Sequence, residues 1–313
     1  MRILPVVLLA FLGGRAFCQK QILPDYQADP SAHVWQGTTW IYPSHDLPNS
    51  QDWAMTDWHA FSSKDLKTWK DEGVIFSLDS ITWAKKWAWA PDAAFRNGTY
   101  YFYFPADGMI GVATAKTPKG PFKDALGKPL IGKNESGTFV IDPCVFQDTD
   151  GQAYLYFGQN NSRVVKLKDD MVTREGDIIN MDVANFHEGS WMHKKGDWYY
   201  LSYCSREAES VEMPEYPGGA PKKVKYNSRI AYSVSKSPLG PWQYKGVIID
   251  NYSRNNHHSI VEIKKKWYLF YHVQGPSFFE RRVCMEPLRF RPDGTIVPID
   301  LPNTGLRKVA AVK

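Results

Sequence analysis

The chain has 313 residues and a formal net charge of +5, with 43% hydrophobic and 14% aromatic residues, including 12 Trp. So modest a charge indicates neither a nucleic-acid partner nor attraction to an acidic membrane surface. A length near 300 residues suits one large β domain or two ordinary domains. Aromatic rings serve both a large sheet core and a sugar-binding site, so their abundance does not choose between the two.

The first 18 residues are expected to be a secretory signal peptide. A positive residue opens the segment, an apolar run covers residues 3–13, and Ala16 and Cys18 occupy the small positions before the cleavage site. This run is too short for a lasting membrane span. We therefore expect residues 19–313 to form one secreted or periplasmic domain, monomeric and without a membrane span. Lipid attachment at Cys18 fits less well, because Phe17 stands where that cleavage needs a small residue.

Outside this leader the chain has three cysteines, Cys144, Cys204 and Cys284. An odd number permits at most one disulfide, and no CxxC spacing suggests a zinc site. Buried free thiols are expected, although the sequence leaves one pairing open.

One pattern returns five times along the chain: an anchor residue, a short strand, a turn and an aromatic-rich strand. The aromatic strands include residues 100–104 (YYFYF) and 267–271 (WYLFY). Successive anchors lie 46 to 69 residues apart, enough for four short strands. In chain order the five anchors are Asp29, Asp92, Asp142, Glu188 and His257.

The turns between these strands predict hairpins. Residues 97–98 (NG) and 150–151 (DG) stand between apolar runs, where tight hairpin turns need positive φ. Two later turns, 117–122 (TPKGPF) and 237–242 (SPLGPW), closely resemble each other. Helical periodicity is almost absent. Five repeats of four antiparallel strands predict an all-β fold, a five-bladed β-propeller; the alternative, a β-sandwich, does not explain five anchors in register.

The anchors are expected to meet in one ring, because the first strand of each propeller blade lines the central axis. Four carboxylates around one funnel are costly, since like charges raise one another's pKa, so function explains them better than packing does. Asp142 adjoins Glu188 in the ring and helps it keep the proton that a general acid requires. Asp29 stands in a non-adjacent blade, where it would stay ionised and activate water.

This arrangement predicts an inverting glycoside hydrolase. Inverting enzymes hold base and acid about 6.5–9.5 Å apart to admit a water molecule. Non-adjacent blades suit that separation better than adjacent ones do. Asp29 is therefore the predicted base and Glu188 the predicted acid.

Five segments resemble the motifs of glycoside hydrolase family 43, in that family's order and over nearly the whole chain after the leader. They are residues 28–31 (ADPS), 89–92 (WAPD), 141–144 (IDPC), 187–189 (HEG) and 257–260 (HHSI). The resemblance implies an inverting enzyme of the α-L-arabinofuranosidase or β-xylosidase type, or in some branches one acting on galactosides. It also implies that Asp29 is the base, Glu188 the acid and Asp142 the residue that tunes and orients the acid.

Further roles follow from the same resemblance. No cofactor is required for the chemistry, but a structural calcium or other ion is implied in the central channel near His257; a purely hydrogen-bonding His257 stays open. Trp89 is similar to a residue bordering the sugar pocket, and Arg282 to an arginine that reaches the substrate. A core role for Trp89 and a surface role for Arg282 stay open as well. Asp92 is expected to be structural, hydrogen-bonded to nearby backbone.

Other functions compete with this one. A retaining, invertase-like propeller is disfavoured because the chain lacks the Asn-Asp-Pro-Asn, Arg-Asp-Pro and Glu-Cys segments of that group. A non-catalytic carbohydrate-binding propeller would be indicated by loss of the base or the acid, and both are present. An endo-acting arabinanase or galactanase type is also open. Exo action on the side chains of plant or other polysaccharides is favoured, because the long segment 206–226 could wall off one end of a groove.

Overall fold

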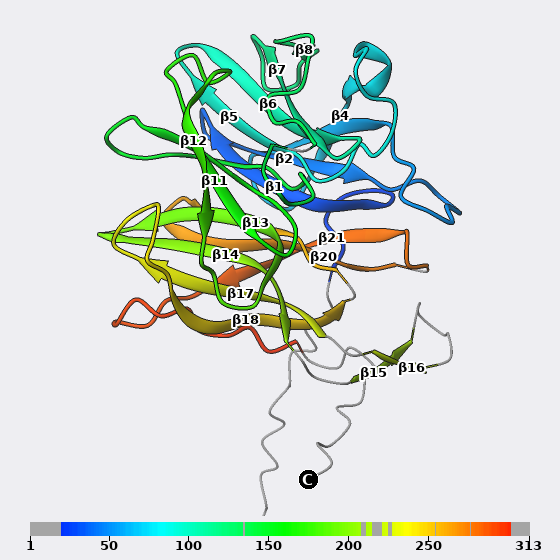
Figure 1. Cartoon of the computed structure of the whole chain (residues 1–313). Helices are drawn as coiled ribbons and strands as arrows, with labels where there is room; N and C mark the ends of the chain where they lie inside the picture. Colours follow the sequence, from blue (N-terminus) through cyan, green and yellow to red (C-terminus); the bar gives the residue numbers. More distant parts are fainter. Residues whose placement is uncertain are drawn as a thin grey trace, which may run out of the picture.

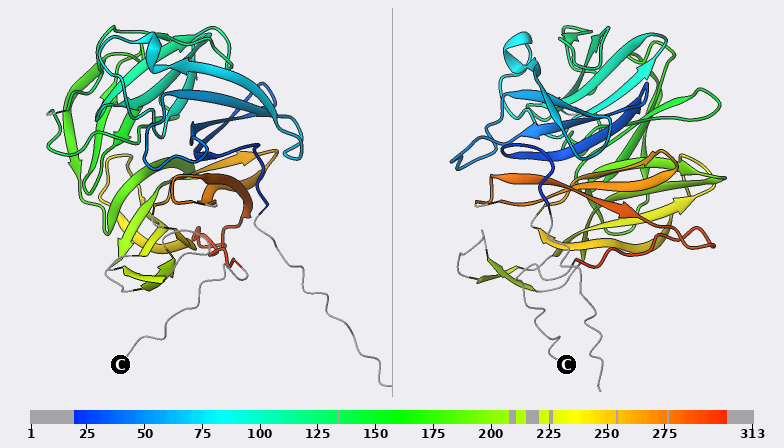
Figure 2. Two further views of the ribbon diagram at one scale, coloured as in Figure 1. Left: turned by 90° about the vertical axis from the view of Figure 1, so that its right-hand side faces the viewer. Right: turned by 180° about the vertical axis from the view of Figure 1, so that it is seen from behind.

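The computed structural model describes residues 20–301 apart from residues 134, 208–210, 215–220, 225–226, 254 and 276; the predicted leader and Cys18 lie outside these ranges. Five antiparallel sheets are arranged as blades around a common axis (Figures 1 and 2). The all-β, five-bladed propeller is thereby confirmed. Within the described ranges the helical structure is one short 3-10 turn, η1 (Leu78–Ser80), and none of these residues forms a helix long and apolar enough to span a bilayer.

Each of the first four blades contains four strands. Blade one consists of β1 (Gln27–Trp35), β2 (Thr38–His45), β3 (Asp57–Ser63) and β4 (Lys70–Ser77). Blade two consists of β5 (Asp92–Arg96), β6 (Thr99–Ala106), β7 (Met109–Ala115) and β8 (Lys123–Asp124). Blade three consists of β9 (Cys144–Gln147), β10 (Ala153–Phe157), β11 (Ser162–Leu167) and β12 (Arg174–Met181). Blade four consists of β13 (Phe186–Lys195), β14 (Trp198–Glu207), β17 (Asn227–Ser235) and β18 (Gln243–Ser253).

A separate two-stranded sheet, β15 (Val211–Pro214) and β16 (Pro221–Val224), is inserted between β14 and β17. It falls within the long segment expected at 206–226. The first strands of neighbouring blades contact one another, which brings the anchor residues together near the axis.

The fifth blade closes the ring with help from the start of the described chain. It consists of β19 (His258–Ile263), β20 (Lys266–Gln274) and β21 (Arg281–Leu288). The Ile22 N–H donates to the Val283 carbonyl at 2.9 Å, so the N-terminal segment pairs with β21 where other blades have a fourth strand. Leu23 is 2% exposed and belongs to a cluster that joins Ile41 of blade one to Phe270 of blade five. The beginning and end of the propeller are thus held by one apolar interface.

A hairpin forms at both predicted turns, but residues 150–151 lie in a five-residue connection, 148–152, rather than in a tight two-residue turn. Between β5 and β6, Asn97 and Gly98 have φ values of 50° and 75°. Between β19 and β20, Lys264 and Lys265 adopt φ values of 50° and 64° without a glycine. Two consecutive residues with positive φ match the right-handed twist of the flanking strands.

The two similar turns make the same contact in different blades. The Tyr42 hydroxyl of blade one donates to the Pro118 carbonyl at 2.7 Å, and the Tyr156 hydroxyl of blade three donates to the Pro238 carbonyl at 2.8 Å. A tyrosine of one blade therefore anchors the outer turn of the next in both places. The three cysteines of the blades, Cys144, Cys204 and Cys284, are buried free thiols, as expected.

Candidate active site

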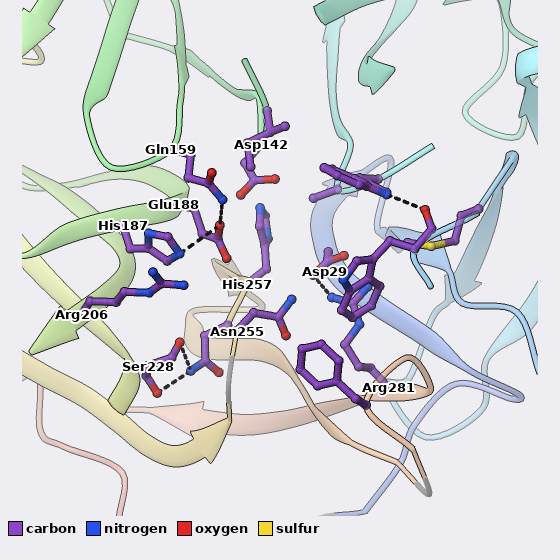
Figure 3. Close-up of a pocket in the computed structure, with 17 residues that line it drawn as sticks. Asp29, Asp142, Gln159, His187, Glu188, Arg206, Ser228, Asn255, His257 and Arg281 are labelled. Atoms are coloured by element: carbon purple, nitrogen blue, oxygen red, sulfur yellow. Dashed lines mark hydrogen bonds and ion pairs between the residues drawn. The ribbon is translucent and has the colours of Figure 1, made fainter. Parts of the chain in front are cut away.

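Four of the five anchors line one cavity of about 600 Å³ (Figure 3). Asp29 lies in β1 and Glu188 in β13, while Asp142 and His257 lie just before β9 and β19. Each anchor thus sits at the start of its blade, as the repeat register predicts. The cavity size is typical of a small-ligand site.

The fifth anchor, Asp92, does not line the cavity. Its Oδ1 accepts a hydrogen bond from the Ser31 hydroxyl at 2.6 Å, and its Oδ2 accepts one from the Val145 N–H at 2.6 Å. The carboxylate therefore joins blades one, two and three. This placement agrees with the structural role expected for Asp92.

The backbone at the anchors leaves regular strand geometry. Asp29 and Asp142 have φ values of 50° and 56°, which are uncommon for residues other than glycine although Asp tolerates them better than most. The β1–β2 register shifts between Ala28 and Ser31, and such irregularities re-aim side chains next to active sites. Gly189 has φ 66°, and a Cβ there would lie 3.0 Å from the Asn256 carbonyl oxygen, so both conformation and space favour glycine beside Glu188.

Asp29 is buried among groups that favour its ionised form. Its Oδ1 lies 2.7 Å from Arg281 Nη1, and its Oδ2 accepts a hydrogen bond from the Ser44 hydroxyl. Its N–H donates to His272 Nδ1 at 3.2 Å. Burial alone would raise the pKa of Asp29, but the Arg281 charge and then His272 outweigh it and hold the pKa well below its usual range. Asp29 is therefore a carboxylate at any physiological pH.

Arg281 is itself held in place by Asp46. Its Nε donates to Asp46 Oδ2 at 2.9 Å and its Nη2 to Asp46 Oδ1 at 2.8 Å, a bidentate pair. The Arg281 side chain is 3% exposed, and its guanidinium lies 4.5 Å from the centre of the Trp53 ring. This packing leaves the Nη1 donor directed at Asp29.

The expected substrate-facing arginine, Arg282, is not placed in the cavity; Arg281 lines it instead. Successive residues of a strand point to opposite faces of the sheet, so only one of the two adjacent arginines in β21 can face the site. The Arg282 guanidinium lies 5.7 Å from the centre of the Tyr26 ring. Arg282 therefore lies outside the cavity, and its neighbour in the same strand lines it.

Glu188 lies on the opposite side of the cavity from Asp29 (Figure 3). Gln159 Nε2 donates to Glu188 Oε2 at 2.8 Å, and His187 Nε2 lies 3.3 Å from the same oxygen. The His187 Nδ1 in turn lies 2.8 Å from Asn160 Oδ1. Burial lowers the pKa of His187, which keeps this ring neutral near pH 7.

Asp142 lies next to Glu188 (Figure 3). Its Oδ2 accepts a hydrogen bond from the Gly189 N–H at 2.9 Å, so it contacts the backbone that carries Glu188. Burial and then the charges of Glu188 and Asp29 raise the pKa of Asp142 well above its usual value. The two sides of the cavity therefore differ, with one strongly ionised carboxylate facing a pair of interacting carboxyl groups.

His257 lines the cavity and is 4% exposed. Neither of its ring nitrogens has a hydrogen-bond partner among the described residues. Burial lowers the pKa of His257, so the neutral ring presents one lone pair. A water molecule or a cation in the channel would satisfy that lone pair. No close group of three metal-ligating side chains that includes His257 occurs in the described ranges.

Trp89 combines the two roles left open for it. It lines the cavity, its Nε1–H donates to the Trp53 carbonyl at 2.9 Å, and its ring stacks on Trp87 with centroids 5.1 Å apart. It also packs against the core between blades one and two. Trp89 is thus a packed residue with one face on the cavity.

Several lining residues had no signal in the repeats, because they lie on loops or at strand ends. Besides Arg281 these include Trp53, Gln159, Arg206, Asn255 and Phe278.

Comparisons with known proteins agree with this geometry. The sequence model of Glycosyl hydrolases family 43 matches residues 18–296. The chain is 32% identical to a xylosidase/arabinosidase of Bacteroides ovatus, over 88% of this chain and 95% of that protein.

Two solved structures share the fold. One is a β-xylosidase/α-arabinofuranosidase from a compost microbial metagenome in complex with xylotriose, with a TM-score of 0.77, 31% identity, and coverage of 90% of this chain and 97% of that one. The other is an α-L-arabinofuranosidase from Clostridium thermocellum, with a TM-score of 0.74, 38% identity, and coverage of 87% and 92%. The chain therefore belongs to glycosyl hydrolase family 43 and is a glycosidase.

Proposed function

We propose that this glycosidase is an exo-acting, inverting enzyme that removes xylosyl or arabinofuranosyl residues, with Asp29 as base and Glu188 as acid. The observation that carries the proposal is the placement of these two groups on opposite sides of one cavity, in different electrostatic surroundings. The sugar class is supported by the similar proteins, which are named for activity on xylosides and arabinosides.

The proposed step is a single displacement. A water molecule held by Asp29 attacks the anomeric carbon and passes its proton to that carboxylate while the bond to the leaving oxygen breaks. Glu188 gives its proton to the leaving oxygen. Afterwards Asp29 loses a proton to solvent and Glu188 regains one, which restores the starting state.

The contacts of Glu188 support its role as proton donor. When the His187 Nδ1–H donates to Asn160 Oδ1, the Nε2 lone pair is left facing Glu188 Oε2. A neutral ring in this tautomer can accept a hydrogen bond from a protonated carboxyl group. Asp142, joined to the Gly189 N–H, fixes the adjacent backbone and acts as the positioning residue for the acid.

Exo action is supported by a wall on the Asp29 side of the cavity. Trp53, from the loop after β2, contacts Phe278 and Phe279, from the loop before β21, with ring centroids 5.2 and 4.8 Å apart. The Asn49 N–H donates to Glu280 Oε1 at 2.8 Å across the same two loops. Loops joined in this way block the passage of a long chain, which an endo-acting groove needs.

A cation near His257 is a finer part of the proposal. The two ring nitrogens of His257 have no hydrogen-bond partner among the described residues, which supports a cation there. Calcium prefers oxygen ligands, so water molecules would have to supply most of its coordination. This chain would then bind the ion weakly. Addition and chelation of Ca²⁺ should shift the melting temperature of the parent and not of His257→Ala if the ion binds there.

The test is a panel of 4-nitrophenyl glycosides with the parent, Asp29→Asn and Glu188→Gln. Each substitution should reduce kcat by more than about a hundredfold, since both groups act directly in the transition state. Asp197→Asn and Glu175→Gln, at exposed positions, serve as matched controls and should retain activity. Full activity in both site variants would refute the proposal. A parent that binds glycans and cleaves none would instead indicate a carbohydrate-binding propeller.

A further inference from the structure

We propose that His45, Asp57 and His59 form a binding site for a transition-metal ion of the Zn²⁺ type on blade one, separate from the catalytic cavity. Each residue offers one ligand atom, and these atoms all lie within 4.8 Å of one another. None of the three lines the cavity.

Strand geometry explains why the three side chains meet. Asp57 and His59 are two residues apart in β3, so they point to the same face of the sheet. The β2–β3 pairing matches Ile41 with Phe61, and the same antiparallel register continued to the end of β2 places His45 opposite Asp57. The two imidazole rings are 4.5 Å apart between centroids.

The contacts of the two rings suit a shared metal ion. His45 Nδ1 lies 2.7 Å from Asp57 Oδ1, and His59 Nδ1 lies 3.2 Å from Asp71 Oδ1 of β4. The Asp71 carboxylate can accept from the His59 Nδ1–H, which fixes the tautomer and leaves the His59 Nε2 lone pair for an ion. Asp57 is itself a proposed ligand, so His45 would bind the same ion through its deprotonated Nδ1, which lies beside Asp57 Oδ1. The His59 Nε2 has no hydrogen bond to another described residue. Asp71 is therefore assigned as the residue that orients His59.

The exposure and chemistry of the group indicate the type of ion. The side chains of His45, Asp57 and His59 are 23%, 25% and 17% exposed, so an ion can enter from solvent without unfolding the blade. Two imidazole nitrogens and one carboxylate oxygen suit Zn²⁺, whereas Ca²⁺ requires mainly oxygen ligands. Water would complete the coordination.

The site lies behind the catalytic base. Ser44 and Asp46, the neighbours of His45, contact Asp29 and Arg281. His45 contacts Asp57 instead, on the other face of the strand. A metal ion at His45 is thus expected to stabilise the strand end that holds the base, without entering the cavity.

The experiment is isothermal titration of the metal-free full chain with ZnCl₂ and, separately, with CaCl₂. The proposal predicts that one Zn²⁺ binds to the parent and that His45→Gln, His59→Gln or Asp57→Asn weakens its affinity at least tenfold. Asp71→Asn should weaken it about tenfold, because it removes only the orienting hydrogen bond. CaCl₂ should show no binding that depends on these residues.

Two controls separate this site from others. Asp197→Asn removes an exposed carboxylate in blade four and should leave Zn²⁺ affinity unchanged. His257→Ala, in the catalytic cavity, should also retain it. Circular dichroism and melting in the absence of metal establish that each variant is folded, and the three ligand variants give independent tests. Zn²⁺ binding to folded His45→Gln and His59→Gln as tight as to the parent, or no Zn²⁺ binding by the parent, would overturn the proposal.

Discussion

The guanidinium of Arg281 joins the catalytic carboxylate Asp29 to a second buried carboxylate, Asp46, with Nη1 lying 2.7 Å from Asp29 Oδ1. The bidentate pair with Asp46 fixes the arginine, and the arginine in turn fixes the base. Because all three groups are buried, this ion-pair chain is little weakened by solvent or salt. It sets both the charge and the position of Asp29.

Replacing Arg281 with Met should reduce kcat/KM by about a hundredfold or more, since a base displaced by about 1 Å loses that much. The pKa of Asp29 should rise without the Arg281 charge, so the acidic limb of the pH profile of kcat/KM should move to higher pH. Steady-state kinetics from pH 3 to pH 8 on the best glycoside of the panel would measure both effects.

Arg282→Met is the matched control for that experiment. Its side chain lies against Tyr26, outside the cavity, so kcat/KM should change less than about threefold. A large loss for Arg282→Met together with a small one for Arg281→Met would show that the strand faces are assigned the wrong way round.

Asp46→Asn should lower the free energy of unfolding by about 2 kcal/mol, because the amide replaces one of the two oxygens that accept from Arg281 and leaves a buried N–H donor without an acceptor. Urea denaturation at pH 7 measures the change. Asp52→Asn, at an exposed position of the neighbouring loop, should change stability by less than about 0.5 kcal/mol. Equal stabilities of the two variants would argue against the ion-pair chain.

Asp142→Asn should make the protein more stable but less active. The pKa of Asp142 is raised in the folded state, by burial first and then by Glu188, so ionisation of this group costs stability as pH rises above the unfolded value of 3.8. The amide removes that cost and can still accept from the Gly189 N–H. Its melting temperature should exceed that of the parent at pH 7, with the difference disappearing below about pH 4.

The activity of Asp142→Asn should fall at least tenfold, because Glu188 loses its interacting neighbour. A variant less stable than the parent at pH 7 would contradict the direction of this pKa shift. Thermal melts over a pH series, paired with kinetics at each pH, give both readouts.

Leu23→Ala should destabilise the fold by about 3 kcal/mol, since it opens a cavity where blades five and one meet. Val34→Ala, at a side chain that is 38% exposed, should have an effect below about 0.5 kcal/mol. Chemical denaturation of both variants would test whether the N-terminal segment closes the ring. If Leu23→Ala leaves the free energy of unfolding unchanged, closure of the ring depends on the blades alone.

The sequence was sufficient to predict the blades because each repeat carries its own turn and aromatic strand. The anchors could be aligned for the same reason, and their register led to the cavity. The sequence did not predict which individual residues at the strand ends face the cavity. The choice between Arg281 and Arg282 depends on which face of β21 turns inward, and two adjacent arginines provide no alternation from which to read it.

Contacts between blades were also beyond prediction. Gln159 reaches Glu188 from a loop after β10, and Trp53 meets Phe278 across two blades. Such loops follow no repeat, so their positions are set by packing in the folded ring. The contribution of Ile22 to blade five likewise depends on closure of the whole propeller.

The central claim is that Asp29 and Glu188 act together in a single displacement. Proton NMR of the parent during the first minutes of hydrolysis, on a xyloside or arabinofuranoside that it cleaves, tests this most directly. Inversion predicts that the first-formed sugar has the anomeric configuration opposite to that of the substrate, followed by slow mutarotation. A first product with the same configuration as the substrate would contradict the account.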